Sequence, residues 1–178
     1  MAIIKIKDKT FKTFIPEAEI MQRVEAVANR INKDFEGKNP IFLSVLNGSF
    51  IFSADLMRFI TTPCEITFVK VASYQGTGST GQIKELIGIG TSLKGRDVII
   101  LEDIVDTGLT MKHLLDSLQK QEPASLHVCT LLSKPGRLKV DLPLEYVAMQ
   151  IPDDFIVGYG LDYDQQGRNL RDIYTIVE

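Results

Sequence analysis

Hydrophobic positions along the chain follow two periods, which alternate from one segment to the next. Residues 16–35 carry apolar side chains three and four positions apart with charges between them, as an amphipathic helix does. A break follows at Gly37-Lys38-Asn39-Pro40, and residues 41–46 are then almost continuously apolar, as in a strand buried on both faces. The pattern therefore predicts a helix followed by a buried strand.

The alternation continues as far as residue 132. Helices are expected over 50–60 and 109–120, and strands over 66–71, from 96 or 97 to 101, and over 126–132. Strands that alternate with helices imply right-handed crossovers and a parallel sheet. We expect an α/β fold, a flavodoxin-like parallel sheet of about five strands flanked by helices.

The C-terminal part of the chain has a different pattern. Short strands are expected near 146–149, 156–159 and 173–177, joined by loops rich in Pro, Asp and Gly. We interpret residues 133–178 as a small hood on a single domain that spans residues 1–178, because one domain is the default for a chain of this length and hydrophobic content.

Composition excludes several classes of protein. The chain has 178 residues, 44% of them hydrophobic, and a net charge of −3, which gives no electrostatic footprint for nucleic acid or an anionic membrane. No apolar run is long enough to span a bilayer, and the start does not resemble a secretory signal. Cys64 and Cys129 lie in apolar segments, which favours core thiols over a disulfide. We expect a cytoplasmic protein without nucleic-acid or membrane partners.

The strand that ends near residue 101 leads into the most polar junction of the chain. Glu102 and Asp103 follow its apolar run, and Asp106 opens the turn Thr107-Gly108-Leu109-Thr110 before the next helix. Ligands collect at the carboxyl ends of strands in open α/β sheets, and free N–H groups at a helix start suit phosphate. The two threonines add hydroxyl donors, and Gly108 allows close backbone approach.

Carboxylates repel phosphate, so Glu102 and Asp103 require another partner. Ribose hydroxyls and a divalent cation both fit, and a ribose 5-phosphate supplies the phosphate and the diol together. The alternative is that the two carboxylates end a strand in solvent and that Asp106 only caps a helix. The coincidence of several polar features at one strand–helix junction favours a ligand site.

The segment from 98 to 111 resembles the phosphoribosyl pyrophosphate (PRPP) signature of the type I phosphoribosyltransferases, and most of all their hypoxanthine-guanine branch. The resemblance implies that Glu102 and Asp103 hold the ribose hydroxyls, directly or through Mg²⁺. It also implies that Asp106 is the general base or hydrogen-bond acceptor for the purine N7 proton. The implied nucleotide site consists of Glu102, Asp103, Ile104, Val105, Asp106, Thr107, Gly108, Leu109 and Thr110.

The segment 73–81 is rich in Gly, Ser and Thr. Composition alone favours a plain surface hairpin. The resemblance instead implies the family's closing loop, which begins with Ser73 and Tyr74 and excludes water during the reaction.

A second turn, Leu46-Asn47-Gly48-Ser49, directly follows a buried strand, so its N–H groups can cradle an anion. It resembles the family's pyrophosphate loop, which often has a cis peptide before the position of Asn47. Members often carry a basic residue where this chain has Asn47, which removes a side-chain charge from pyrophosphate binding. The resemblance assigns Asn47, Gly48, Ser73, Tyr74 and Arg168 to pyrophosphate.

The base site depends on the resemblance most strongly. Taken alone, Lys134 is a solvated charge at a strand end, and Phe155 and Ile156 are core residues. The run 151–163 nevertheless resembles the family's purine-binding hood. The match implies that Lys134 donates to the 6-oxo group, Phe155 stacks on the ring and the Ile156 carbonyl faces the base. Asp162 would help to hold Mg²⁺ and face the amino side of guanine.

These assignments together imply transfer of ribose 5-phosphate from PRPP to hypoxanthine or guanine, with Mg²⁺ as cofactor and IMP or GMP and pyrophosphate as products. The family also implies a homo-oligomer, a dimer or a tetramer. Two alternatives stay open. One is an enzyme that uses xanthine or another nucleobase as acceptor, and the other is a nucleotide-sensing regulator that binds nucleic acid.

Overall fold

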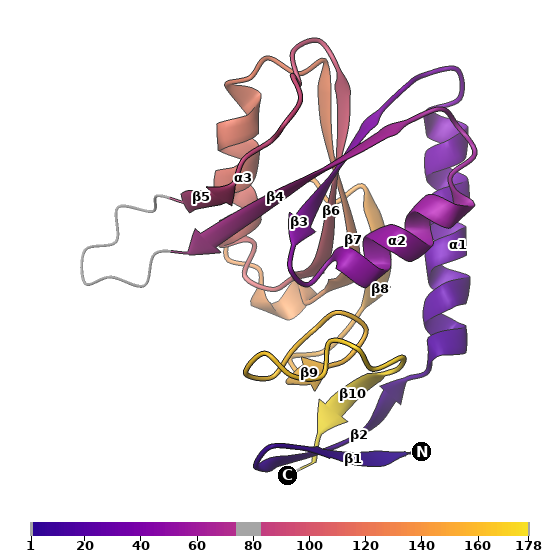
Figure 1. Ribbon diagram of the computed structural model, residues 1–178, viewed down its shortest axis with the longest axis vertical. Helices are drawn as coiled ribbons and strands as arrows, with labels where there is room; N and C mark the ends of the chain where they lie inside the picture. Colours follow the sequence, from indigo (N-terminus) through magenta and orange to yellow (C-terminus); the bar gives the residue numbers. More distant parts are fainter. Residues whose placement is uncertain (1, 74–82, 178) are drawn as a thin grey trace.

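The computed structural model describes residues 2–73 and 83–177. Within them, a six-stranded sheet with the order β5-β4-β3-β6-β7-β8 forms the centre of the molecule (Figure 1). Strands β4, β3, β6, β7 and β8 run parallel, and β5 pairs antiparallel to β4. The expected parallel sheet is confirmed. Its strands are β3 (Ile41–Leu46), β4 (Glu65–Ser73), β5 (Ile83–Ile87), β6 (Asp97–Val105), β7 (Ser125–Ser133) and β8 (Tyr146–Gln150).

Helices cover both faces of this sheet. α1 (Glu17–Asp34) and α2 (Phe50–Phe59) lie on one side, and α3 (Leu109–Gln119) lies on the other (Figure 1). Successive strand residues point to opposite faces. Phe42 and Leu101 therefore pack in the cluster that includes α1 and α2, whereas Leu43 and Ile100 pack in the cluster that includes α3. The continuous apolar runs of β3 and β6 are the sequence signature of this two-sided burial.

The hood is a second, antiparallel sheet with the order β1-β2-β10-β9. It consists of β1 (Ile3–Ile6), β2 (Lys9–Ile15), β9 (Ile156–Val157) and β10 (Ile173–Ile176). The first and the last strand of the chain, β1 and β10, both belong to it, at one end of the molecule (Figure 1). Its own small core contains Ile6, Phe11, Val157 and Tyr174.

The hood differs from the sequence expectation in two respects. The segment near 146–149 was expected in the hood, but β8 adds to the large sheet, where Tyr146 pairs with Cys129 of β7. In its place, residues 3–15 supply two hood strands that the pattern did not predict. Short strands carry little information about their partners, since pairing across the whole chain decides which sheet they join.

The motif strand is longer than expected. The apolar run ends at Leu101, but β6 continues in parallel register with β7 as far as the pair Val105–Ser133. Glu102 and Asp103 are therefore strand residues, and the loop begins only at Asp106. This places the two carboxylates on successive positions of a strand, which point to opposite sides of the sheet.

The sheet has a topological switch point between β3 and β6. These strands are neighbours, but the chain leaves β3 for β4 on one side and leaves β6 for β7 on the other. The two departing loops diverge and leave a crevice at the carboxyl ends, where ligands bind in such folds. Both turns singled out in the sequence start there.

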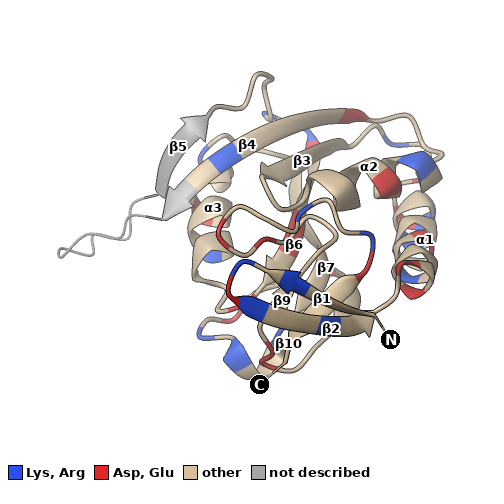
Figure 2. Ribbon diagram, turned by 60° about the horizontal axis from the view of Figure 1, so that its bottom comes forward, with Lys and Arg blue, Asp and Glu red and all other residues tan. Residues whose placement is uncertain are grey.

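Of the two cysteines expected in the core, Cys129 is buried and Cys64 is partly buried. Cys64 and Cys129 are free thiols. No helix in the described part of the chain combines the length and the apolar character needed to cross a membrane. Figure 2 shows lysines on the hood strands β1 and β2 and acidic residues in the loops beside them.

Candidate active site

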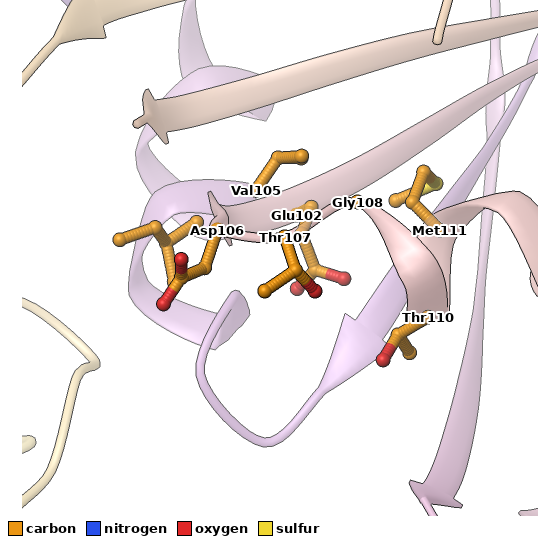
Figure 3. Close-up of a pocket in the computed structure, with 8 residues that line it drawn as sticks. Glu102, Val105, Asp106, Thr107, Gly108, Thr110 and Met111 are labelled. Atoms are coloured by element: carbon orange, nitrogen blue, oxygen red, sulfur yellow. The ribbon is translucent and has the colours of Figure 1, made fainter. Parts of the chain in front are cut away.

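The turn after β6 encloses a pocket of about 110 Å³ at the start of α3 (Figure 3). Gly108 adopts φ 81°, and a Cβ there would lie 2.7 Å from Leu142 Cδ1, so both conformation and packing require glycine. The Leu109 N–H faces the Thr107 hydroxyl at 3.5 Å, while the Leu109 side chain is exposed. The pocket is lined by Glu102, Ile104, Val105, Asp106, Thr107, Gly108, Thr110 and Met111.

Glu102 and Asp103 serve two different parts of this crevice. Glu102 lines the pocket of the turn, whereas the Asp103 carboxylate lies against Gly48 in the loop after β3. Burial raises the pKa of Glu102 well above its usual range, and the neighbouring Asp103 charge adds to this rise. Burial also raises the pKa of Asp103, opposed by the Ile104 N–H at 2.9 Å and by Arg168. Such a pair favours a cation or hydroxyl donors as a partner.

The loop after β3 begins with a cis peptide between Leu46 and Asn47. The Asn47 side chain is exposed. A Cβ on Gly48 would lie 1.7 Å from Asp103 Oδ2, and a Cβ on Gly160 would lie 2.1 Å from the Gly48 carbonyl oxygen. The Gly48 backbone is thus held between the strand carboxylate and the hood.

If PRPP binds here, as the resemblance implies, Gly48→Ala is expected to raise the KM for PRPP at least about tenfold, because the added methyl must displace the Asp103 carboxylate or the loop backbone. Steady-state kinetics and a thermal melt of the same sample measure the effect. Gly136→Ala is the matched control, since nothing lies within 4 Å of a Cβ at that position. An unchanged KM for PRPP would separate Gly48 from substrate binding.

Phe155 projects from the hood with one side exposed. Its side chain is 45% exposed, and its ring packs edge-on against Tyr163, with centroids 5.8 Å apart. Phe11 of β2 supports the ring from a centroid distance of 6.2 Å. Ile156 is buried beside it and pairs with Thr175 in the β9–β10 ladder. One face of the Phe155 ring is therefore accessible for stacking on a planar ligand. The ring is supported by Phe11 from the start of the chain and by Tyr163 from its C-terminal part.

Lys134 is a buried cation rather than a solvated strand end, with 7% exposure. Its Nζ donates to the Asp154 carbonyl at 2.8 Å and approaches Asp153 Oδ1 at 3.3 Å. Its backbone N–H donates to the Val105 carbonyl at 3.0 Å, which brings Lys134 beside Asp106. The structure therefore brings together two predicted site residues, each of which directly follows a different strand.

Asp162 and Arg168 form an ion pair, with Oδ1 and Nη2 2.8 Å apart. The second oxygen of Asp162 accepts from the Gln165 N–H at 2.8 Å, and Arg168 also donates to the Gly160 carbonyl at 2.8 Å. Among the described residues, no three His, Cys, Asp or Glu side chains gather as metal ligands. Asp162 thus does not form one joint metal cluster with Glu102 and Asp103.

The closing-loop hypothesis for residues 73–81 lies outside the described residues, apart from Ser73. Ser73 is the last residue of β4 and pairs through its backbone with Ile83 of β5. The predicted role of Tyr74 stays a prediction.

The chain matches the family model "Phosphoribosyl transferase domain" over residues 15–164. The chain belongs to the phosphoribosyltransferase family. It is 40% identical to the hypoxanthine phosphoribosyltransferase of Salmonella typhimurium, over 94% of this chain and 96% of that one. It is 42% identical to the hypoxanthine-guanine phosphoribosyltransferase of Streptococcus mutans, over 94% and 93%. A crystal structure of the hypoxanthine-guanine phosphoribosyltransferase of Bacillus anthracis superposes with a TM-score of 0.89 at 45% identity, covering 93% and 98%.

Around Asp106 and Phe155 the structure places residues that sequence reasoning did not single out. Arg137 Nε lies 3.0 Å from Asp106 Oδ1, and Arg137 Nη1 lies 3.1 Å from Asp153 Oδ2. The Pro135-Gly136 pair before Arg137 was a usable signal, because such a pair turns the chain back after a strand. Phe11 gave no such signal, since only the pairing of β2 with β10 brings it to the hood.

Asn47→Lys tests the predicted role of the loop after β3 in pyrophosphate binding by this phosphoribosyltransferase. The exposed side chain indicates that a cation there adds a modest, solvent-screened interaction. We expect the apparent PRPP affinity to change by no more than about tenfold, or ~1.4 kcal/mol. Initial rates against PRPP concentration measure it. A hundredfold gain in PRPP affinity would show that the wild-type loop lacks a contact that a basic side chain at position 47 can supply.

Proposed function

We propose that this protein is a purine salvage enzyme that transfers ribose 5-phosphate from PRPP to hypoxanthine or guanine, releasing pyrophosphate and forming IMP or GMP. The observation that carries the proposal is the hydrogen bond from the Lys134 N–H to the Val105 carbonyl, which sets Lys134 beside Asp106. A cationic donor and a carboxylate acceptor match the 6-oxo group and the N7 proton on one edge of a 6-oxopurine. The names of the relatives support the same substrates.

The reaction breaks the bond between C1 of the ribose and pyrophosphate and forms a bond from C1 to N9 of the base. Pyrophosphate leaves with the electron pair, and the N7 proton passes to Asp106 as general base. Lys134 donates to the 6-oxo oxygen, where negative charge develops as the proton leaves. Phe155 stacks on the base through its exposed face.

The turn from Asp106 to Thr110 holds the 5′-phosphate. Its N–H groups at the start of α3 and the hydroxyls of Thr107 and Thr110 supply donors without a cationic side chain. Gly48 and Arg168 contact the pyrophosphate, and the Arg168 charge also acts on Asp103. Arg168 reaches this position because it is held by Asp162 and the Gly160 carbonyl.

Glu102 and Asp103 fit Mg²⁺, because a hard divalent cation takes carboxylate oxygens and would offset the burial and the neighbouring Asp103 charge that raise the pKa of Glu102. The two residues would hold Mg²⁺ or contact the ribose hydroxyls directly. Asp162 would act at a separate position, beside Arg168. Bound Mg²⁺ would neutralise charge on the leaving pyrophosphate.

A spectrophotometric panel tests the proposal. The enzyme is incubated with PRPP, Mg²⁺ and each of hypoxanthine, guanine, xanthine, adenine and uracil. We expect turnover of hypoxanthine or guanine and background rates with adenine and uracil. Turnover of only xanthine or another base would show that the enzyme uses a different acceptor base.

The regulator alternative predicts retention on heparin at moderate salt, because nucleic-acid binding needs a basic surface. The chain has 20 basic and 23 acidic residues, and charges of both signs are mixed around the hood (Figure 2). We therefore expect early elution.

A further inference from the structure

Arg137 bridges two carboxylates at the edge of the proposed base site. Its Nε contacts Asp106 Oδ1 at 3.0 Å, and its Nη1 contacts Asp153 Oδ2 at 3.1 Å. Asp153 uses its other oxygen on Lys134 Nζ, at 3.3 Å. The four side chains form a line of alternating charge from the proposed general base to the proposed 6-oxo donor.

Backbone hydrogen bonds fix the position of this line. The short helix η1 (Pro135–Arg137) is closed by the Arg137 N–H, which donates to the Lys134 carbonyl at 2.9 Å. Lys134 is itself bound to Val105, and the Lys139 N–H donates to the Thr107 carbonyl at 3.0 Å. The segment that carries Arg137 is therefore attached to β6 and its turn on both sides of Asp106.

The contacts of Arg137 suit positioning better than stabilisation. The side chains of Asp106, Arg137 and Asp153 are 40%, 44% and 55% exposed, and ion pairs between half-exposed groups add little to folding stability. A guanidinium can engage two carboxylates through different nitrogens of one rigid plane, whereas an ammonium offers a single charged centre. Arg137 therefore restricts the orientation of Asp106 because its guanidinium contacts Asp106 and Asp153 at the same time, which a lysine could not do as well.

We infer that Arg137 is a positioning residue for the proposed reaction, which orients the Asp106 carboxylate and, through Asp153, ties it to Lys134 before the base binds. The inference rests on the proposed function. Arg137 occupies Oδ1 of Asp106, so Oδ2 is the oxygen that receives the N7 proton. Arg137 stays protonated, since the contact with Asp106 raises its pKa further. The N7 acceptor and the 6-oxo donor are thus set at a fixed separation on one edge of the base.

Arg137→Met removes the charge but keeps most of the apolar stem. We expect kcat on hypoxanthine to fall about tenfold, with the KM for PRPP within twofold of wild type, because the phosphate turn and the loop after β3 are unchanged. Arg137→Lys should have an intermediate kcat, since it can contact only one of the two carboxylates well. Arg23→Met is the matched control, because Arg23 pairs with Glu19 on the surface of α1.

A double-mutant cycle with Asp106→Asn separates positioning from a general structural effect. When residue 106 cannot take a proton, its orientation no longer limits the rate, so adding Arg137→Met should lower kcat less than twofold further. A full additional tenfold loss would overturn the inference. Wild-type kcat for Arg137→Met would overturn it as well.

A thermal melt and the activity of the wild-type enzyme distinguish failure of this inference from loss of folding and from failure of the proposed function. A thermal melt of each variant checks the fold, and if Arg137→Met is not folded, the same cycle is run with Arg137→Lys. If the wild-type enzyme turns over no 6-oxopurine, the proposed function fails. If the wild type is active and the cycle is additive, only the role of Arg137 fails.

Discussion

Lys134→Ala is expected to lower kcat/KM on hypoxanthine and guanine by on the order of a thousandfold, while the background rate on adenine stays the same. Lys134 Nζ has three donors, and the Asp154 carbonyl and Asp153 account for two of them. The third donor suits a 6-oxo oxygen. The 6-amino group of adenine would face it donor to donor and leave a buried ammonium without its partner. For the same reason, the wild type should prefer 6-oxopurines over adenine by about 10⁴-fold.

Kinetics on both bases, with one enzyme preparation for each variant, measure this difference. Lys120→Ala is a suitable control, because Lys120 is an exposed residue at the end of α3, away from the turn. Unchanged hypoxanthine kinetics in Lys134→Ala, or similar wild-type rates on adenine, would contradict the role of Lys134. The claim that the enzyme uses 6-oxopurines would then lose its main support.

Asp106→Asn is expected to lower kcat by about a hundredfold with the fold intact, within the range for loss of a general base. Asparagine keeps the shape of the side chain and a carbonyl oxygen for Arg137, but it cannot take the N7 proton. The contact between Asp106 and Arg137 is half-exposed, so its weakening should leave the melting temperature nearly unchanged.

The control for Asp106→Asn is Asp116→Asn, which removes an exposed carboxylate paired with Lys112 on α3. Steady-state rates and thermal melts of both variants, compared with wild type, decide between two roles for Asp106. Near-normal kcat would leave it as a residue that only orders the turn at the start of α3.

The main elements could be predicted from the sequence because their signals are local. The helix over 16–35 and the strand over 41–46 were expected, and the structure has α1 at Glu17–Asp34 and β3 at Ile41–Leu46. Amphipathic periodicity and burial on both faces impose these patterns on the residues themselves. The same reasoning placed Glu102, Asp106 and Gly108 at one strand–helix junction, and they line one pocket.

The local sequence pattern was insufficient wherever pairing between distant strands determines the length of a strand or the sheet that it joins. The extension of β6 to Val105 depends on its ladder with β7, and the place of β8 depends on the same strand. The first strands of the chain show no long apolar run, yet they complete the hood because β10 pairs with β2. Whether a short strand is buried depends on the distant strand with which it pairs, and the local sequence does not contain that information.

By itself, the sequence determined the alternation of strands and helices, the parallel sheet and the positions of its two polar turns, since hydrophobic period and turn residues are local properties. Only the tertiary structure decided that Gly48 packs against Asp103 and that Arg137 and Asp153 connect Asp106 to Lys134. These contacts join residues far apart in the chain, or depend on side-chain direction at a strand end. Their existence follows from the order of strands in the sheet and from the closure of the hood over it.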